Sequence, residues 1–196
     1  MQAAAVGIAL ANENLALAIA EARQGWQLSM GACLVNEATV SANTEAVTED
    51  NCKNVVLGVR KEVVKAKGTA DIILCSPDFY TTVLAVAGKE FTPTINDRIN
   101  ATGNVGKWLG FTFVEFNGLA EASAKYYNYE NNLKTVDFTG VDFIMYNHEA
   151  LSGVTNFEAA RLKDAEGFVG TLAQTEMNSG FRVTNSALAY VHKHTA

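Results

Sequence analysis

The residues best placed to do chemistry are Cys75 and Ser76, inside the stretch DIILCSPDFYTTVLAVAG (71–88). This stretch reads as a buried strand, a tight junction and a short helix, and such a junction can display a nucleophile. A hydrolase elbow has glycines around its serine, whereas the local sequence here is ILCSPDF. Pro77 also removes a backbone N–H that an oxyanion hole would use. Ser76 is therefore predicted to be a helix N-cap, with Pro77 at the first helical position.

Cys75 could instead be a nucleophile, because a helix N-terminus lowers the pKa of a nearby thiol. A Cys/His pair would then need His148 close to it. The last residue of an apolar strand is more often part of the core. Cys33 and Cys52 complete a set of three cysteines with no CxxC spacing, so no structural zinc site is expected. Buried free thiols in a reducing compartment are the simpler interpretation.

The remaining candidates are histidines and one glycine-rich stretch. His148 is expected at a helix start, and His192 and His194 could bind a metal at their spacing of two, but no third ligand is visible. Solvated histidines are the simpler interpretation. GNVGKWLG (103–110) lacks the pattern of a phosphate loop and precedes a strand instead of following one. The sequence therefore predicts no catalytic residue, no cofactor-binding residue and no metal ligand, and the chain is not expected to be an enzyme.

The composition is that of a globular chain. Of its 196 residues 48% are hydrophobic and 18% charged, which fits one domain, or one domain with a lobe. A net charge of −6 argues against broad contact with a nucleic acid backbone. The apolar start of the chain is interrupted by Asn12, Glu13 and Asn14, after about half of the ~20 residues that cross a membrane. A soluble, cytoplasmic chain with no membrane partner is expected.

Three helices are predicted to position these residues. The first covers 9–24, and Gly25 is expected to end or bend it. The second covers 49–67, with Thr48 as its N-cap and Gly68 after its end. Its apolar stripe is Cys52, Val55, Val56, Val59 and Val63. The third starts after Ser76 and is closed by Gly88.

Strands are predicted at 32–35, 110–116 and 141–147, and Asn147 is predicted to cap a short helix. Residues 89–110 are expected to be mainly loop, and 119–135 form a polar stretch with clustered tyrosines. In the tail, TNFEAARLKD and FRVTNSALAYVHK alternate as strands do, whereas GFVGTLAQTEMNSG is compatible with helix or strand. The pattern indicates an α+β or mixed α/β fold.

The order of these pieces resembles the C-terminal two-thirds of the major capsid proteins of tailed phages of the Hong Kong 97 type. In that family a helix leads into a strand with a Ser-Pro or Asn-Pro junction, and a G-x-x-x-G-hydrophobic-x-V stretch and an "hEA"-like stretch follow. The matching positions here are Gly106, Gly110, Phe111, Val114, His148, Glu149 and Ala150. The resemblance covers residues 48–196.

The resemblance implies an α+β capsid-subunit fold, in which a spine helix and a strand layer form a peripheral domain beside a mixed α/β axial domain. Residues 1–47 would be an N-terminal segment with a spine-like helix. Residues 48–153 would be the axial-like domain, and residues 154–196 the returning strands of the peripheral-like domain. Family members carry a long N-terminal arm and an extended hairpin before these elements. This chain is then a minimal version, or its N-terminal portion is absent or replaced.

The function that the resemblance implies is that of a structural virion protein. It would assemble with copies of itself, in hexamers and pentamers, into an icosahedral phage capsid that encloses double-stranded DNA without sequence-specific contact. Loop 89–105 would lie where subunits meet around a symmetry axis, and other virion proteins would be further partners. The chain would be made in the host cytoplasm. Two alternatives stay open: a small thiol-dependent enzyme using Cys75 and His148, and a tail-tube or decoration protein of a phage.

Overall fold

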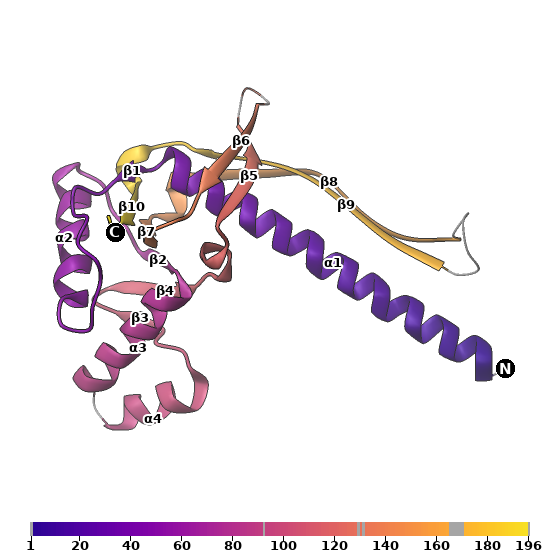
Figure 1. Cartoon of the computed structure of the whole chain (residues 1–196), viewed down its shortest axis with the longest axis horizontal. Coiled ribbons are helices and arrows are strands. Elements are labelled where there is room, and N and C mark those ends of the chain that lie inside the picture. Colours follow the sequence, from indigo (N-terminus) through magenta and orange to yellow (C-terminus); the bar gives the residue numbers. More distant parts are fainter. Residues whose placement is uncertain (1, 92, 129, 131, 165–170, 196) are drawn as a thin grey trace.

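The computed structural model consists of a body and a long arm that projects from it (Figure 1). It describes residues 2–91, 93–128, 130, 132–164 and 171–195. The helices are α1 (Gln2–Glu37), α2 (Cys52–Lys65), α3 (Pro77–Glu90) and α4 (Pro93–Thr102). The strands are β1 (Thr39–Val40), β2 (Ile72–Cys75), β3 (Lys107–Trp108), β4 (Phe111–Glu115), β5 (Ser123–Tyr127), β6 (Leu133–Asp137), β7 (Val141–Tyr146), β8 (Leu151–Asp164), β9 (Thr171–Val183) and β10 (Ala189–Lys193). The fold is mixed α+β, as the sequence predicted.

The arm is made of α1 and the antiparallel hairpin β8–β9, which extend from the body in the same direction (Figure 1). Helix α1 has 36 residues, and it is therefore roughly 54 Å long at 1.5 Å per residue. Near the body, Trp26 of α1 packs edge-on against Phe181 of β9, with ring centroids 5.1 Å apart. This contact anchors the helix to the hairpin where both leave the body.

The first predicted helix, 9–24, does not end at Gly25, and the strand predicted at 32–35 is wrong, because α1 continues to Glu37. A Cβ added at Gly25 would meet no other atom within 4 Å. An exposed glycine costs a helix only about 1 kcal/mol relative to alanine, and packing on both sides outweighs that cost. Beyond the glycine, Ala32 and Leu34 are fully buried and hold the last turns in place.

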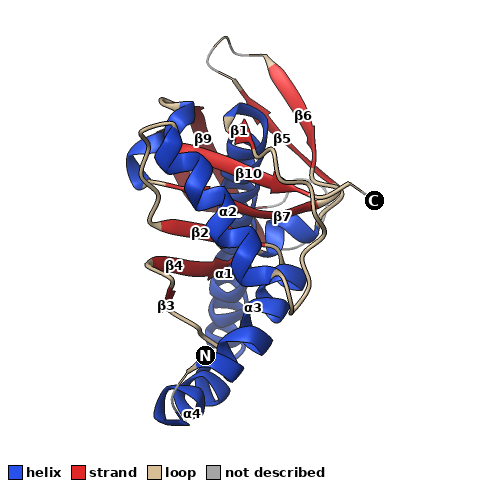
Figure 2. Ribbon diagram, turned by 90° about the vertical axis from the view of Figure 1, so that its left-hand side faces the viewer, coloured by secondary structure: helices blue, strands red, loops and turns tan. Residues whose placement is uncertain are grey.

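The body is built on a six-stranded sheet with the strand order β1-β10-β7-β2-β4-β3. Strand β2 pairs in parallel with β4 and antiparallel with β7, and β1 pairs in parallel with β10. Figure 2 shows these strands with α2 in front of them. The strands predicted at 110–116 and 141–147 are therefore confirmed as β4 and β7.

The sheet separates two hydrophobic cores. On one face, Ile73 and Cys75 of β2 pack with the apolar stripe of α2 and with α3. On the other face, Leu74 and Ile144 pack with the end of α1 and with the β5–β6 hairpin. Successive residues of a strand point to opposite faces, so one short strand contributes to both cores.

The predicted end of α2 is corrected in one detail. Lys67 adopts the left-handed conformation, with φ of 60°, and its N–H donates to the Val64 carbonyl. Gly68 follows, and its N–H donates to the Val63 carbonyl. A Cβ at Gly68 would overlap the backbone of Ala187. This glycine is required because two backbones approach closely, and not because of its φ.

Two local predictions near helix starts are also wrong. Helix α2 begins at Cys52 with Asn51 in the N-cap position, so Thr48 is not its N-cap, and the Asn51 side chain makes no capping bond to the first turn. It accepts the Thr48 N–H at 2.7 Å instead, which holds the turn that precedes the helix. Residues 93–102 form α4, although 89–110 was expected to be mainly loop. Proline is compatible with the first helical position, so Pro93 starts this helix instead of preventing it. Helix α3 also runs past Gly88 to Glu90.

The polar stretch 119–135 contains the β5–β6 hairpin, which the sequence analysis did not predict. Ala124 and Tyr126 point inward from β5, and the residues that alternate with them, Ser123, Lys125 and Tyr127, are exposed. The predicted capping by Asn147 is confirmed, because its side chain accepts the Glu149 N–H at 2.9 Å, but the helix is a single 3-10 turn.

The tail forms β8, β9 and β10. Of the stretch 167–180, which was left open as helix or strand, residues 171–180 belong to β9, and residues 167–170 lie outside the described residues. The strand predicted at 155–164 lies within β8. The strand predicted at 181–193 is divided between the end of β9 and β10. The division of the chain into 1–47, 48–153 and 154–196 stays a prediction. Within the last segment, β8–β9 lies in the arm, whereas β10 pairs with β7 in the body.

Candidate functional site

Ser76 is a helix cap, as the sequence predicted. Its side chain is buried and accepts a hydrogen bond from the Phe79 N–H at 3.3 Å, and Pro77 occupies the first helical position. The Ser76 N–H itself donates to the Asp142 carbonyl at 2.9 Å, which ties the helix start to β7. The serine oxygen is therefore used to hold the start of α3.

Cys75 and His148 are not brought together. Cys75 pairs with Phe143 in the sheet, whereas His148 follows the other end of β7, beyond the pair Ile72 and Tyr146. The two pairs are three residue steps apart, a distance of roughly 10 Å along the strand. His148 is exposed and lies 3.4 Å from the Asp71 carboxylate. The geometry of a thiolate–imidazole pair is therefore absent.

The environment of the thiols also disfavours nucleophilic chemistry. All three cysteines are free and buried. Burial raises the pKa of Cys52 to about 11 and that of Cys33 to about 12, and it raises the pKa of Cys75 further. Because the thiolate is the reactive form, these side chains behave as small apolar core residues.

His192 and His194 share one carboxylate. Their Nδ1 atoms lie 3.0 Å and 2.9 Å from the same Oδ2 atom of Asp142. The prediction that both are solvated is wrong for His192, which is fully buried and stacked on Phe143 with centroids 5.0 Å apart. Within the part of the chain that the structure describes, no group of three His, Cys, Asp or Glu side chains could hold a metal ion. The cluster instead fastens the last strand to β7.

A second polar cluster, which the sequence analysis missed, joins the arm to the body. Glu37, the last residue of α1, accepts the Tyr126 hydroxyl at 2.8 Å and the Val183 N–H at 2.9 Å. Asn36 donates to the Tyr126 oxygen at 2.9 Å. The position of Glu37 at the helix C-terminus is unfavourable by itself, but here the carboxylate connects α1 to β5 and β9. The sequence around Asn36 and Glu37 gives no indication of Tyr126 or Val183, because both partners are far away in the chain.

The glycine-rich stretch 103–110 is a structural turn. Gly103, Gly106 and Gly110 have φ of 65°, 69° and 90°. The Tyr80 hydroxyl donates to the Gly103 carbonyl at 3.3 Å and accepts the Val105 N–H at 3.2 Å. These two hydrogen bonds of the Tyr80 hydroxyl hold the loop against α3.

The most distinctive surface is the arm. Exposed large apolar side chains are Leu17 of α1, Val154 and Leu162 of β8, and Leu172 of β9. A hollow of about 690 Å³ lies where α1 meets the body, between Ala16–Met30 on the helix and Leu74 with 114–118 on the sheet side. No described helix is both long enough and apolar enough to cross a membrane. These extended surfaces are suited to contacts with other protein chains.

Searches of family models and of curated proteins found no match to this sequence. Solved structures do match. A chain described as Mycobacterium phage Che8 has a TM-score of 0.60 at 14% identity, covering 90% of this chain and 60% of that chain. The capsid structure of the cyanophage P-SCSP1u has a TM-score of 0.58 at 18% identity, covering 88% and 61%. The mature capsid of bacteriophage PhiM1 has a TM-score of 0.57 at 15% identity, covering 88% and 61%.

The chain thus has the fold of phage capsid subunits over 88–90% of its length. It spans about 60% of the length of the chains that it matches. A virus-like particle from Pyrococcus furiosus shares the fold with a TM-score of 0.54 at 11% identity, covering 87% of this chain and 63% of that chain. At these identities the likeness concerns the fold.

Proposed function

We propose that this chain is the structural subunit of an icosahedral phage capsid of the Hong Kong 97 type, assembled from many copies of itself. The observation that carries the proposal is a likeness to phage capsid subunits over about 90% of the chain. An arm that places apolar side chains in solvent is consistent with it, since repeated modest contacts stabilise a shell. The subunits would form hexamers and pentamers through heterologous contacts, which close into rings.

In this proposal the shell contains double-stranded DNA, which is retained because it is enclosed and not because the subunit makes sequence-specific contacts with it. The net charge of −6 supports this, because broad contact with a phosphate backbone needs an excess of cations. The subunit would be made in the host cytoplasm and end in the virion, with other virion proteins as further partners. It would act without a cofactor and without an enzymatic activity.

Electron microscopy and sedimentation velocity of the purified chain test the proposal. Closed particles, or hexamers and pentamers at lower concentration, are the expected species. A chain that stays monomeric at all concentrations and salt conditions, with or without co-expressed virion proteins, would count against a shell subunit. Open tubes or stacked rings would favour a tail-tube protein, the alternative within the same class.

A thiol-dependent enzyme is the alternative of a different class, and it has a direct test. The raised pKa of Cys52, about 11, and the burial of Cys75 predict slow reaction of both with a thiol reagent at pH 8. Unfolding the chain should make all three cysteines reactive. Rapid labelling of Cys75 in the folded chain would revive the enzymatic alternative.

A further inference from the structure

The end of α2 carries an exposed cluster of cations around an apolar side chain. Val64 is 55% exposed. Arg60, Lys61, Lys65 and Lys67 surround it in sequence, and each is exposed. The helix dipole explains a cation in the last turn, but its effect does not reach back to Arg60 and Lys61. None of these four cations forms an ion pair with another described residue. We call these five residues the basic knob.

A hollow of about 570 Å³ with complementary properties lies elsewhere on the body. Asp78, Glu121 and Asp142 contribute carboxylates to its lining, and Val47 and Ala120 contribute apolar surface. Asp142 is already engaged by the two histidines, whereas Asp78 and Glu121 are exposed and form no ion pair within the described ranges. We call this feature the acidic hollow.

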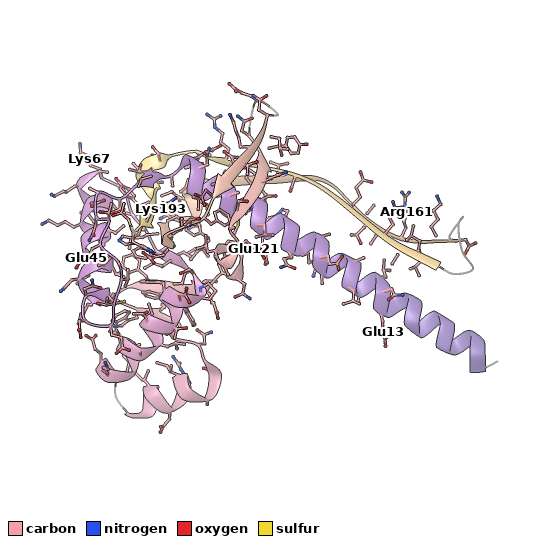
Figure 3. All side chains as sticks on the ribbon, viewed as in Figure 1. Glu13, Glu45, Lys67, Glu121, Arg161 and Lys193 are labelled. Carbon is pink, nitrogen blue, oxygen red and sulfur yellow. The ribbon has the colours of Figure 1, made fainter. Side chains whose placement is uncertain are left out.

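The basic knob and the acidic hollow lie at opposite ends of one strand. The knob precedes Ile72, where β2 begins, and the hollow contains Ser76, which follows the end of β2. Lys67 and Glu121 accordingly lie on different sides of the body (Figure 3). One chain cannot bring the two features together, but identical chains arranged head to tail can do so, and such heterologous contacts close into rings.

We propose that the basic knob of one copy docks into the acidic hollow of the next copy, with Val64 against the apolar wall and Lys65 and Lys67 facing Asp78 and Glu121. The inference rests on the proposed function, since it names the surfaces through which the subunits of a ring meet. Charge complementarity supports a second copy as the occupant, because both partners are present on every chain. A nucleic acid phosphate backbone is the competing occupant of the knob.

Disulfide cross-linking tests the geometry. The variants Lys67→Cys and Glu121→Cys are mixed under mild oxidation, and the expected product is a mixed dimer. The chain that carries both substitutions should instead form a ladder of multiples of the chain mass. The native cysteines do not interfere, because all three are buried. Assembled particles in which neither product forms, or in which only Lys67→Cys pairs with itself, would overturn the proposal.

Charge reversal tests the energetics. Lys65→Glu with Lys67→Glu should raise the concentration needed for assembly by on the order of tenfold or more. Adding Asp78→Lys with Glu121→Lys should restore assembly. The matched control is Lys125→Glu with Lys134→Glu, which makes the same change in charge at two exposed positions of the β5–β6 hairpin and should leave assembly unchanged.

The outcomes separate the two proposals. If the unmodified chain forms no assembly, the proposed function fails. If it assembles and the Lys65→Glu, Lys67→Glu variant assembles equally well, the docking inference alone fails. A variant that assembles normally but loses retention of DNA would assign the knob to nucleic acid, and it would also overturn the docking inference.

Discussion

The body and the arm solve the problem of burying apolar surface in different ways. The body places helices or a hairpin on both faces of its sheet, so that Phe143 and Ile144, neighbours on β7, are each fully buried in different cores. In the arm a single helix lies along a two-stranded hairpin, and Leu17 and Val154 remain 62% and 58% exposed. The body therefore buries most of its apolar surface between its own layers, whereas the arm leaves large apolar side chains along its length in solvent.

The largest expected effect is on the body core. Phe143→Ala should lower the free energy of unfolding by about 4 kcal/mol, because it removes a buried ring between Phe79 and His192. Chemical denaturation monitored by circular dichroism measures the change. A loss below about 1 kcal/mol would mean that the body is not organised around this core.

The joint between body and arm should give the next largest effect. Glu37→Ala leaves the Val183 N–H and the Tyr126 hydroxyl without their shared acceptor, at a cost of about 2 kcal/mol. Faster hydrogen exchange at the Val183 amide is the specific readout. Glu37→Gln is the matched control, since its amide oxygen can still accept one hydrogen bond. Equal exchange rates in the alanine variant and the unmodified chain would contradict the role of the joint.

The helix cap at Ser76 should have a smaller effect. Ser76→Ala removes the acceptor for the Phe79 N–H and should cost about 1 kcal/mol of stability. Thr82→Ala is the control within the same helix, because the exposed Thr82 hydroxyl only donates back to the Asp78 carbonyl and alanine is a good helix former. The two variants are compared by thermal unfolding. If Ser76→Ala and Thr82→Ala unfold at the same temperature, Ser76 does not stabilise the start of α3 as a cap.

The arm should show the smallest effect on the monomer and a large effect on assembly. Leu172→Ser replaces an apolar side chain that is 45% exposed, and it should change the free energy of unfolding by less than about 0.5 kcal/mol. Sedimentation should nevertheless show weaker assembly, since the substitution removes apolar surface that another copy would cover. Thr171 and the residues after it pair with β8 through the backbone, so the hairpin register should survive. Unchanged assembly would remove the distinction between body and arm.

The sequence predicted the elements whose signals are local. The stripe from Cys52 to Val63, the Ser76 cap and the alternation of β4 each depend on neighbours a few residues away, and all three are present in the structure. It failed where a weak local signal competes with tertiary packing. Gly25 lies within α1, and Pro93 begins a helix. Glycine loosens the backbone and proline restricts it, but neither decides what packs against the helix.

The candidate site shows the same division. The absence of a hydrolase elbow could be read from the residues around Ser76 alone. The separation of Cys75 from His148 could not, because it follows from the pairing of β2 with β7. The carboxylate shared by His192 and His194 likewise depends on Asp142, which is about 50 residues away in the sequence and adjacent only in the sheet.

By itself, the sequence determined the type of several elements, the caps at Ser76 and Asn147 and the apolar stripe that packs on the sheet, since short-range hydrogen bonds and periodicity decide these features. Only the tertiary structure decided that α1 runs on to Glu37, that Gly68 is needed where the backbone of Ala187 passes close to it, and that the arm projects from the body. The physical reason is that these features depend on contacts between residues far apart in the chain, and one-dimensional spacing does not encode such contacts.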